Sequence, residues 1–340
     1  MQPVDSFGDF KSVAELEALN ARVREENRFV DVLRAELART VIGQRALIDG
    51  LLIGLLGDGH VLVEGVPGLA KTLAVRTLAT AVSCRFQRVQ FTPDLLPSDL
   101  VGSMVYNQRT GEFVVQRGPI FANIVLADEI NRAPAKVQSA LLEAMQEHQV
   151  TIGGASYPLE EPFLVLATQN PIDQEGTYPL PEAQVDRFML KLVVTYPDRA
   201  EESEMLAHMS SRPDLTVRPI IDATHVLRAR DVVDNIYVDR RAREYALDVV
   251  RATRDPIAAG RPELAPLIAY GASPRAAVSL VRASKAHAFL DGRGYVTPAD
   301  IKALGAAVLR HRVLLTYEAD AENVTSDTIV ARIFDTVPVP

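Results

Sequence analysis

The stretch Gly65-Val66-Pro67-Gly68-Leu69-Ala70-Lys71-Thr72 decides the fold of this 340-residue chain. A short apolar run at residues 60–63 precedes it, and a helical pattern begins at Lys71. A glycine-rich turn between a strand and a helix points backbone N–H groups at a phosphate, and the helix dipole favours the negative charge. We therefore predict that all eight residues bind a nucleotide. Lys71 is expected to reach the β- and γ-phosphates and Thr72 to ligate Mg²⁺.

Ala70 departs from the strict phosphate-loop pattern, which has glycine at this position. Alanine tolerates helical backbone angles at a helix start and keeps its N–H group, so we expect the departure to be mild. The alternative is a chance glycine-rich turn with no ligand, because short motifs also occur without their function.

A second motif is the apolar run at residues 124–127, which ends in Asp128 and Glu129. A buried strand would deliver Asp128 to the crevice at the carboxyl edge of a parallel sheet, where ligands bind. Asp128 suits the Mg²⁺ shell, and Glu129 suits polarisation of an attacking water. The alternative is a helix cap made by the two acidic residues.

Strands alternate with helices through the first two thirds of the chain, which predicts a parallel sheet with helices on both faces. Expected strands lie at residues 60–63, 86–91, 124–127, 163–167 and 189–194, and expected helices at 12–39, 44–56, from 71 onward, and at 135–147. Two β-hairpins, at 104–115 and 150–157, are expected as insertions into this α/β sheet.

Helical periodicity dominates beyond Pro197, with expected helices at residues 201–209, 240–254, 274–289 and 298–311. These patterns divide the chain into four expected parts. They are a helical extension (1–30), a nucleotide-binding α/β domain (31–197), a linker (198–222) and a smaller all-helical lid (223–340).

Composition excludes several classes of protein. The net charge of −8 argues against broad DNA binding, which needs a basic face. The single cysteine cannot form an internal disulfide. No apolar run approaches the roughly 18 residues of a membrane helix, and the first residues lack the pattern of a signal peptide. A cytoplasmic location is the default expectation.

The chain resembles the MoxR family of AAA+ ATPases over about residues 30–335. Four long stretches carry the resemblance, in this order: Gly65–Thr72, Leu126–Pro134, Ala167–Pro171 and Tyr178–Phe188. The family often has alanine at the position of Ala70, so the irregular loop supports the resemblance.

The resemblance assigns further roles. Asn170 matches sensor 1, which positions a water near the γ-phosphate, and Arg187 matches an arginine finger that acts on a neighbouring subunit's nucleotide. Arg275 matches sensor 2 at the start of a lid helix. Val41 and Ile42 match the segment that packs around adenine. The structural alternatives are, in the same order, an Asn-Pro turn, a salt bridge of Arg187 with Asp186 or Glu182, an exposed helix arginine, and a plain loop.

The resemblance implies an ATP hydrolase that uses ATP and Mg²⁺ in a homo-oligomeric ring, expected to be a hexamer. It further implies chaperone-like remodelling of protein clients with a von Willebrand A-domain partner, without membrane insertion or nucleic acid. Three alternatives stay open at this point. They are a DNA-linked AAA+ motor, a small-molecule kinase with a phosphate loop, and a nucleotide-gated scaffold that hydrolyses nothing.

Overall fold

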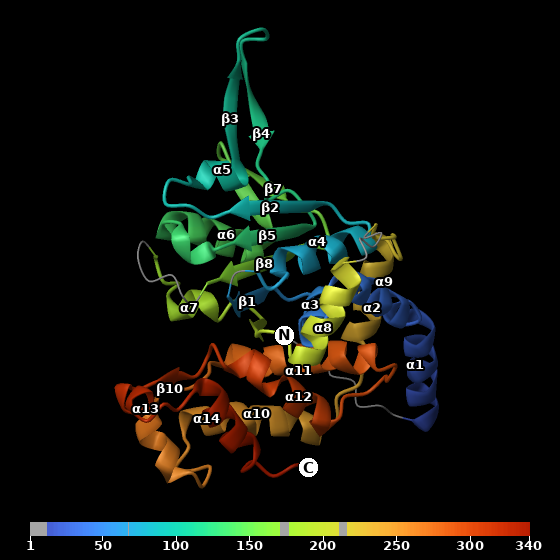
Figure 1. The fold of residues 1–340 in the computed structure, drawn as a ribbon, viewed down its shortest axis with the longest axis vertical. Coiled ribbons are helices and arrows are strands. Elements are labelled where there is room, and N and C mark those ends of the chain that lie inside the picture. The colour runs from blue at the N-terminus through green and yellow to red at the C-terminus, as the bar shows by residue number, and fades with distance from the viewer. Residues whose placement is uncertain (1–11, 67, 171–176, 211–215) are drawn as a thin grey trace, which may run out of the picture. The chain divides into compact units, whose positions relative to one another are not determined.

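A computed structural model describes residues 12–66, 68–170, 177–210 and 216–340 of the chain (Figure 1). The chain divides into two compact units. One spans Asp31–Leu227, and the other joins the segment up to Val30 with Arg228–Pro340. We call them the sheet unit and the lid unit.

The sheet unit is built on five parallel strands in the order β2-β5-β8-β1-β9. Their bounds are β1 (Val61–Gly65), β2 (Phe86–Gln90), β5 (Ile124–Asp128), β8 (Leu164–Gln169) and β9 (Leu190–Val194). Every residue of the interior strand β5 is buried, as expected for a parallel sheet covered on both faces. The predicted parallel α/β sheet is confirmed.

Helices pack against this sheet and contribute side chains to its hydrophobic core (Figure 1). Helix α4 packs on β2 and β5, whereas the inward side of α6 shares a core with Val125, Ala127 and Phe163. The helices of the unit are α2 (Phe29–Thr40), whose first two residues belong to the lid unit, α3 (Arg45–Leu56), α4 (Lys71–Ala81), α5 (Pro97–Val101), α6 (Ala135–Glu147), α7 (Glu182–Val185), α8 (Arg199–Ser210), and the 3₁₀ turn Ile130–Arg132.

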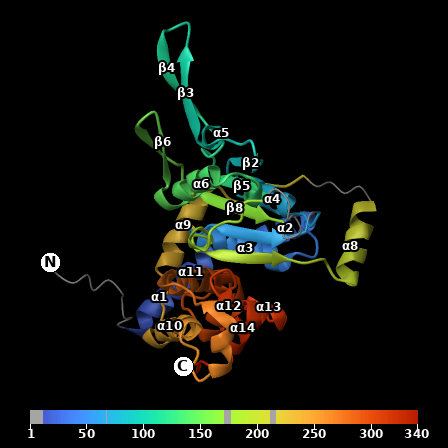
Figure 2. The same cartoon turned by 90° about the vertical axis from the view of Figure 1, so that its left-hand side faces the viewer.

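Two β-hairpins extend from the same side of the sheet unit, as predicted (Figure 2). The longer one pairs β3 (Gly102–Asn107) with β4 (Glu112–Arg117), and the shorter one pairs β6 (Gln149–Ile152) with β7 (Ala155–Pro158). Gly153 sits at the turn of the shorter hairpin with φ of 60°, and a Cβ there would lie 2.7 Å from Met104 on β3. The two hairpins therefore touch each other.

The lid unit is helical, as predicted, except for a two-stranded sheet of β10 (Ile268–Tyr270) and β11 (Leu314–Leu315), whereas an all-helical lid was expected. Its helices are α1 (Val13–Glu26), most of α9 (Ala223–Asp234), α10 (Arg240–Arg254), α11 (Pro274–Leu290), α12 (Pro298–Leu309), α13 (Tyr317–Ala321), α14 (Ser326–Phe334), and the 3₁₀ segment Pro262–Leu267. Within the described ranges, no helix combines the length and apolar composition that crossing a membrane requires.

Helix α1 packs within the lid unit, a placement that the sequence did not indicate. Asn20 Oδ1 accepts a hydrogen bond from Gly294 N at 2.7 Å, and Asn27 Nδ2 donates to Phe289 O at 3.1 Å. Val23 is fully buried. The expected single helix over residues 12–39 is therefore two helices, because the chain turns at residues 27–28 to place α1 against the lid.

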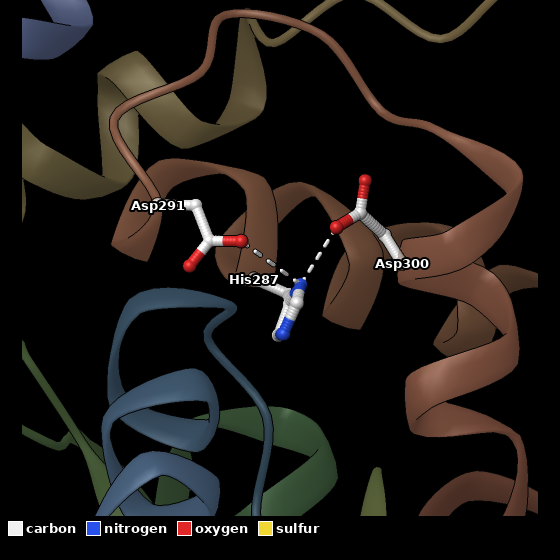
Figure 3. Close-up of side chains that lie close together, drawn as sticks. All are labelled: His287, Asp291 and Asp300. Carbon is white, nitrogen blue, oxygen red and sulfur yellow. Dashed lines mark hydrogen bonds and ion pairs between the residues drawn. The ribbon is translucent and has the colours of Figure 1, made fainter.

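A charged cluster joins the end of α11 to the start of α12 (Figure 3). His287 Nδ1 lies 2.7 Å from Asp300 Oδ1 and 3.9 Å from Asp291 Oδ2. Arg293 Nη2 lies 2.6 Å from Asp300 and 2.9 Å from Asp291. Thr297 also donates to Asp300, which caps α12. Because Arg293 already supplies the positive charge, we interpret this cluster as a helix connection rather than a metal site.

The cluster makes the stability of the lid unit depend on pH. The hydrogen bond with Asp300 raises the pKa of His287 above its ordinary value, and Asp291 adds to this, while burial and Arg293 oppose it. Protonated His287 therefore contributes stability that is complete below about pH 6.5 and is lost as pH rises through the raised pKa.

We expect His287→Gln to cost about 1.5–3 kcal/mol near pH 6, the range for hydrogen bonds to charged groups, and less near pH 9. Thermal unfolding at both pH values measures this. The matched control is His225→Gln, because His225 makes a comparable but exposed pair with Asp222. An equal cost of His287→Gln at both pH values would contradict the assignment.

Candidate nucleotide-binding and hydrolysis site

The predicted phosphate loop lies between β1 and α4, at the carboxyl edge of the sheet. A Cβ on Gly65 would meet Val194 O at 2.7 Å, so only glycine lets β1 run this close to the end of β9. Lys71 Nζ donates a hydrogen bond back to Gly65 O. Leu69 is buried and Val66 is half-buried, while Pro67 lies outside the described residues. The Lys71 side chain thus links the last part of the loop to its first residue, Gly65.

Ala70 is the N-cap of α4 and has φ of 55° and ψ of 16°. The expectation of helical angles at this position is therefore wrong: the residue is left-handed. This conformation costs an L-residue roughly 1–2 kcal/mol and costs glycine almost nothing. The geometry explains why the strict pattern has glycine here, and it shows that alanine is accommodated with strain.

Thr168 connects Asp128, the last residue of β5, with Glu129, the residue after it. Its hydroxyl donates to Asp128 Oδ1 at 2.5 Å and accepts a hydrogen bond from Glu129 N at 2.8 Å. Thr168 is fully buried, and Glu129 has a left-handed φ of 57°. One buried hydroxyl thus holds the Asp128 carboxylate and the backbone N–H group of Glu129. The sequence analysis assigned Thr168 no role, although it lies in a stretch that carries the family resemblance.

Side chains from the edge strand β2 complete the surroundings of these carboxylates. Arg88 donates to Asp128 Oδ2 through Nη2 at 2.6 Å and Nε at 2.9 Å. Gln90 Nε2 donates to Glu129 Oε2 at 2.7 Å, and Arg132 Nη1 lies 3.0 Å from the same oxygen. Arg88 and Gln90 were not predicted, because the strand order that brings β2 beside β5 cannot be read from the sequence. Arg132 was not predicted either, although it lies only three residues after Glu129, in the 3₁₀ turn Ile130–Arg132.

The pKa of Lys71 depends on its burial and on nearby acidic residues. Burial lowers its pKa from the ordinary value, while the charges of Asp128, Glu129 and Glu64 act in the opposite direction. Lys71 therefore shares one electrostatic environment with the two residues that end β5. The cation of the phosphate loop and the candidate catalytic carboxylates therefore act on one another electrostatically.

The remaining predicted residues are distributed around this site or beyond it. Asn170 is buried and directly follows β8, the neighbour of β5, whereas Pro171 of the same motif lies outside the described residues. Arg187 is half-buried in the turn before β9.

Val41 and Ile42 contribute to a cavity of about 420 Å³ between α2, α3 and α8. Val41 is buried and Ile42 is half-buried. Arg275 is exposed as the second residue of α11 in the lid unit, after Ser273 and Pro274. The structure thus gathers Lys71, Asp128, Glu129 and Asn170 on one sheet edge and assigns Arg275 to the other compact unit.

Comparisons with known proteins agree with this arrangement. Residues 60–190 match the family described as "ATPase family associated with various cellular activities (AAA)", and residues 263–333 match the AAA lid domain. Chaperone MoxR1 of Mycobacterium tuberculosis is 48% identical over 305 residues, which is 90% of this chain and 81% of that protein. The uncharacterized protein YeaC of Bacillus subtilis is 45% identical over 303 residues, which is 89% of this chain and 92% of that protein.

A crystal structure of a Cytophaga hutchinsonii protein superposes with a TM-score of 0.88 at 48% identity, covering 96% of this chain and 99% of that one. Sequence, sheet order and lid therefore point to the same group of proteins. The chain belongs to the MoxR family of AAA+ ATPases.

Proposed function

We propose that this protein hydrolyses ATP with Mg²⁺ in an oligomeric ring, expected to be a hexamer, and uses the energy to remodel protein clients together with a von Willebrand A-domain partner. The observation that carries the hydrolytic part is the Thr168 bridge, which holds the Asp128 carboxylate and the Glu129 backbone. The charges of both acidic residues act on Lys71. The chaperone-like part is supported by membership of the MoxR family, which includes Chaperone MoxR1.

Each residue has a role in this proposal. Backbone N–H groups of the loop and Lys71 bind the phosphates, while Val41 and Ile42 pack around adenine. Thr72 and Asp128 offer a hydroxyl and a carboxylate oxygen, the hard donors that Mg²⁺ prefers. Mg²⁺ would neutralise phosphate charge. Glu129 accepts the proton of the attacking water, which Asn170 positions, and Arg275 contacts the nucleotide from the lid.

We expect Lys71→Ala to abolish ATP binding, because the loop loses its only cation for the β- and γ-phosphates. Glu129→Gln should bind ATP normally and trap it, because Asp128 is intact while the proton acceptor is gone. Calorimetry of ATP binding and phosphate release measure the two effects. Lys136→Ala, on the exposed start of α6, is the control for removing a lysine. Rapid turnover by Glu129→Gln would exclude Glu129 as the base.

Substitution of Arg187 tests whether neighbouring subunits of a ring share an active site. As a finger acting in trans, it would stabilise the transition state on the neighbouring subunit, an effect worth about 10³ to 10⁵ in rate in comparable phosphoryl-transfer enzymes. Arg187→Ala should therefore bind ATP almost normally and hydrolyse it very slowly.

Mixing Arg187→Ala with Glu129→Gln should restore part of the activity. A subunit that keeps Glu129 but lacks Arg187 can use the arginine of a Glu129→Gln neighbour. The measurement is ATP hydrolysis during titration of one inactive variant into the other, with subunit exchange shown independently. No recovery in proven mixed rings would count against action in trans.

The β3–β4 hairpin is our candidate for client contact. Tyr106 and Phe113 are paired across it with ring centroids 5.3 Å apart, and they are 52% and 65% exposed. Large exposed apolar groups of this kind are common at interaction sites. The hairpin is inserted between α5 and β5 and is separate in sequence from the phosphate loop.

Shortening residues 107–111, or replacing Tyr106 and Phe113 by serine, should preserve basal ATP hydrolysis and weaken work on a client. Co-purification with a von Willebrand A-domain protein encoded by a neighbouring gene, and its effect on ATP turnover, would measure the loss. Tyr317→Ser removes an even more exposed aromatic from the lid unit as the control. Unchanged partner binding and turnover would make the hairpin a passive surface element.

A further inference from the structure

Both oxygens of the Asp128 carboxylate already have partners in this structure. The Thr168 hydroxyl donates to Oδ1 at 2.5 Å, and Arg88 donates to Oδ2 through two nitrogens, at 2.6 Å and 2.9 Å. The Asp128 side chain is 12% exposed and the Arg88 side chain is 50% exposed. A half-exposed cation therefore covers an almost buried anion.

Arg88 is held in place by more than this one carboxylate. Its Nη2 also donates to Gln90 Oε1 at 2.8 Å. In the strand register Arg88 lies opposite Leu126, and Gln90 lies opposite Asp128. The guanidinium thus reaches along β2 toward the carboxyl edge of the sheet. Two donors on one carboxylate oxygen form a directed, charge-assisted contact, not a loose surface pair.

The donor chemistry of Asp128 fits a hard divalent cation, and so does the hydroxyl of Thr72. Arg88 occupies the Oδ2 side of that carboxylate with a charge that cannot be removed, since the guanidinium does not deprotonate in proteins. Two cations at one carboxylate oxygen repel each other, and the repulsion is strong where water is largely excluded. Binding of a metal ion and the Arg88 contact therefore compete for Asp128.

We propose that Arg88 is the resident counter-ion of Asp128 in the nucleotide-free protein and gives up Oδ2 when Mg²⁺ binds with the nucleotide. Arg88 is then a positioning residue that acts through Asp128 and sets how tightly the site takes up the metal. The inference rests on the proposed function, because it assumes that Asp128 belongs to the Mg²⁺ shell.

The test is the Mg²⁺ dependence of thermal stability at saturating ADP, which involves no turnover. Arg88→Gln should melt at a lower temperature than the wild type in EDTA, because Asp128 loses its counter-ion. The Mg²⁺ concentration that gives half of the stabilisation should fall by about fivefold, as expected when a competing contact worth about 1 kcal/mol is removed. An unchanged half-saturating concentration would overturn the inference.

Two further variants separate this competition from a general loss of stability. Arg85→Gln removes the neighbouring ion pair with Glu160 and should keep the wild-type Mg²⁺ dependence. Adding Arg88→Gln to Asp128→Asn should leave the Mg²⁺ titration of Asp128→Asn unchanged, because the two residues act on the same contact. A persisting difference in that background would place the effect of Arg88 elsewhere.

If Arg88→Gln fails to fold, Arg88→Lys keeps the charge with a single donor group and should give a half-saturating Mg²⁺ concentration below that of the wild type. A value equal to the wild type would count against the directed contact. A wild-type protein that neither binds ADP nor responds to Mg²⁺ would overturn the proposed function and this inference together. A normal wild-type response that no Arg88 variant alters would overturn only the inference.

Discussion

The hydrogen bond from the Thr168 hydroxyl to Asp128 is the interaction on which the geometry of the site depends. It exists because β5 and β8 are adjacent and parallel and end at the same edge of the sheet. The same hydroxyl accepts the N–H group of Glu129, so one buried side chain orients two consecutive acidic residues. Without it, a buried carboxylate oxygen and a buried amide would both lack a partner, which costs more than an ordinary hydrogen bond contributes.

Positively charged side chains lie beside these carboxylates, although the whole chain is acidic. The protein carries a net charge of −8, yet three cations, Lys71, Arg88 and Arg132, surround Asp128 and Glu129. These cations offset the charges of Asp128, Glu129 and Glu64, so the site does not carry the negative charge that would repel a nucleotide phosphate. The acidic composition therefore argues against broad nucleic-acid binding while leaving the nucleotide site electrostatically favourable.

How much could be predicted depended on whether a feature is local in sequence. Helices α6 and α10 were predicted at their observed bounds, and the phosphate loop and the strand that ends in Asp128 were predicted from motifs that lie in one segment. Arg88, Gln90 and Thr168 were not predicted, because each acts across strands that are distant in the chain. The packing of α1 in the lid unit and the β10–β11 pair depend on contacts between segments more than 40 residues apart.

Backbone strain alone would not have located the site. Among the described non-glycine residues, those with positive φ are Asp58, Ala70, Ser83, Glu129, His148 and Asn323. Most of them lie in ordinary turns or helix ends, where the conformation serves the path of the chain. Ala70 and Glu129 differ because they adjoin Lys71 and Asp128. The charge of Asp128 acts to raise the pKa of Lys71. The charged side chains therefore mark this site, and the left-handed backbone beside them is supporting evidence only.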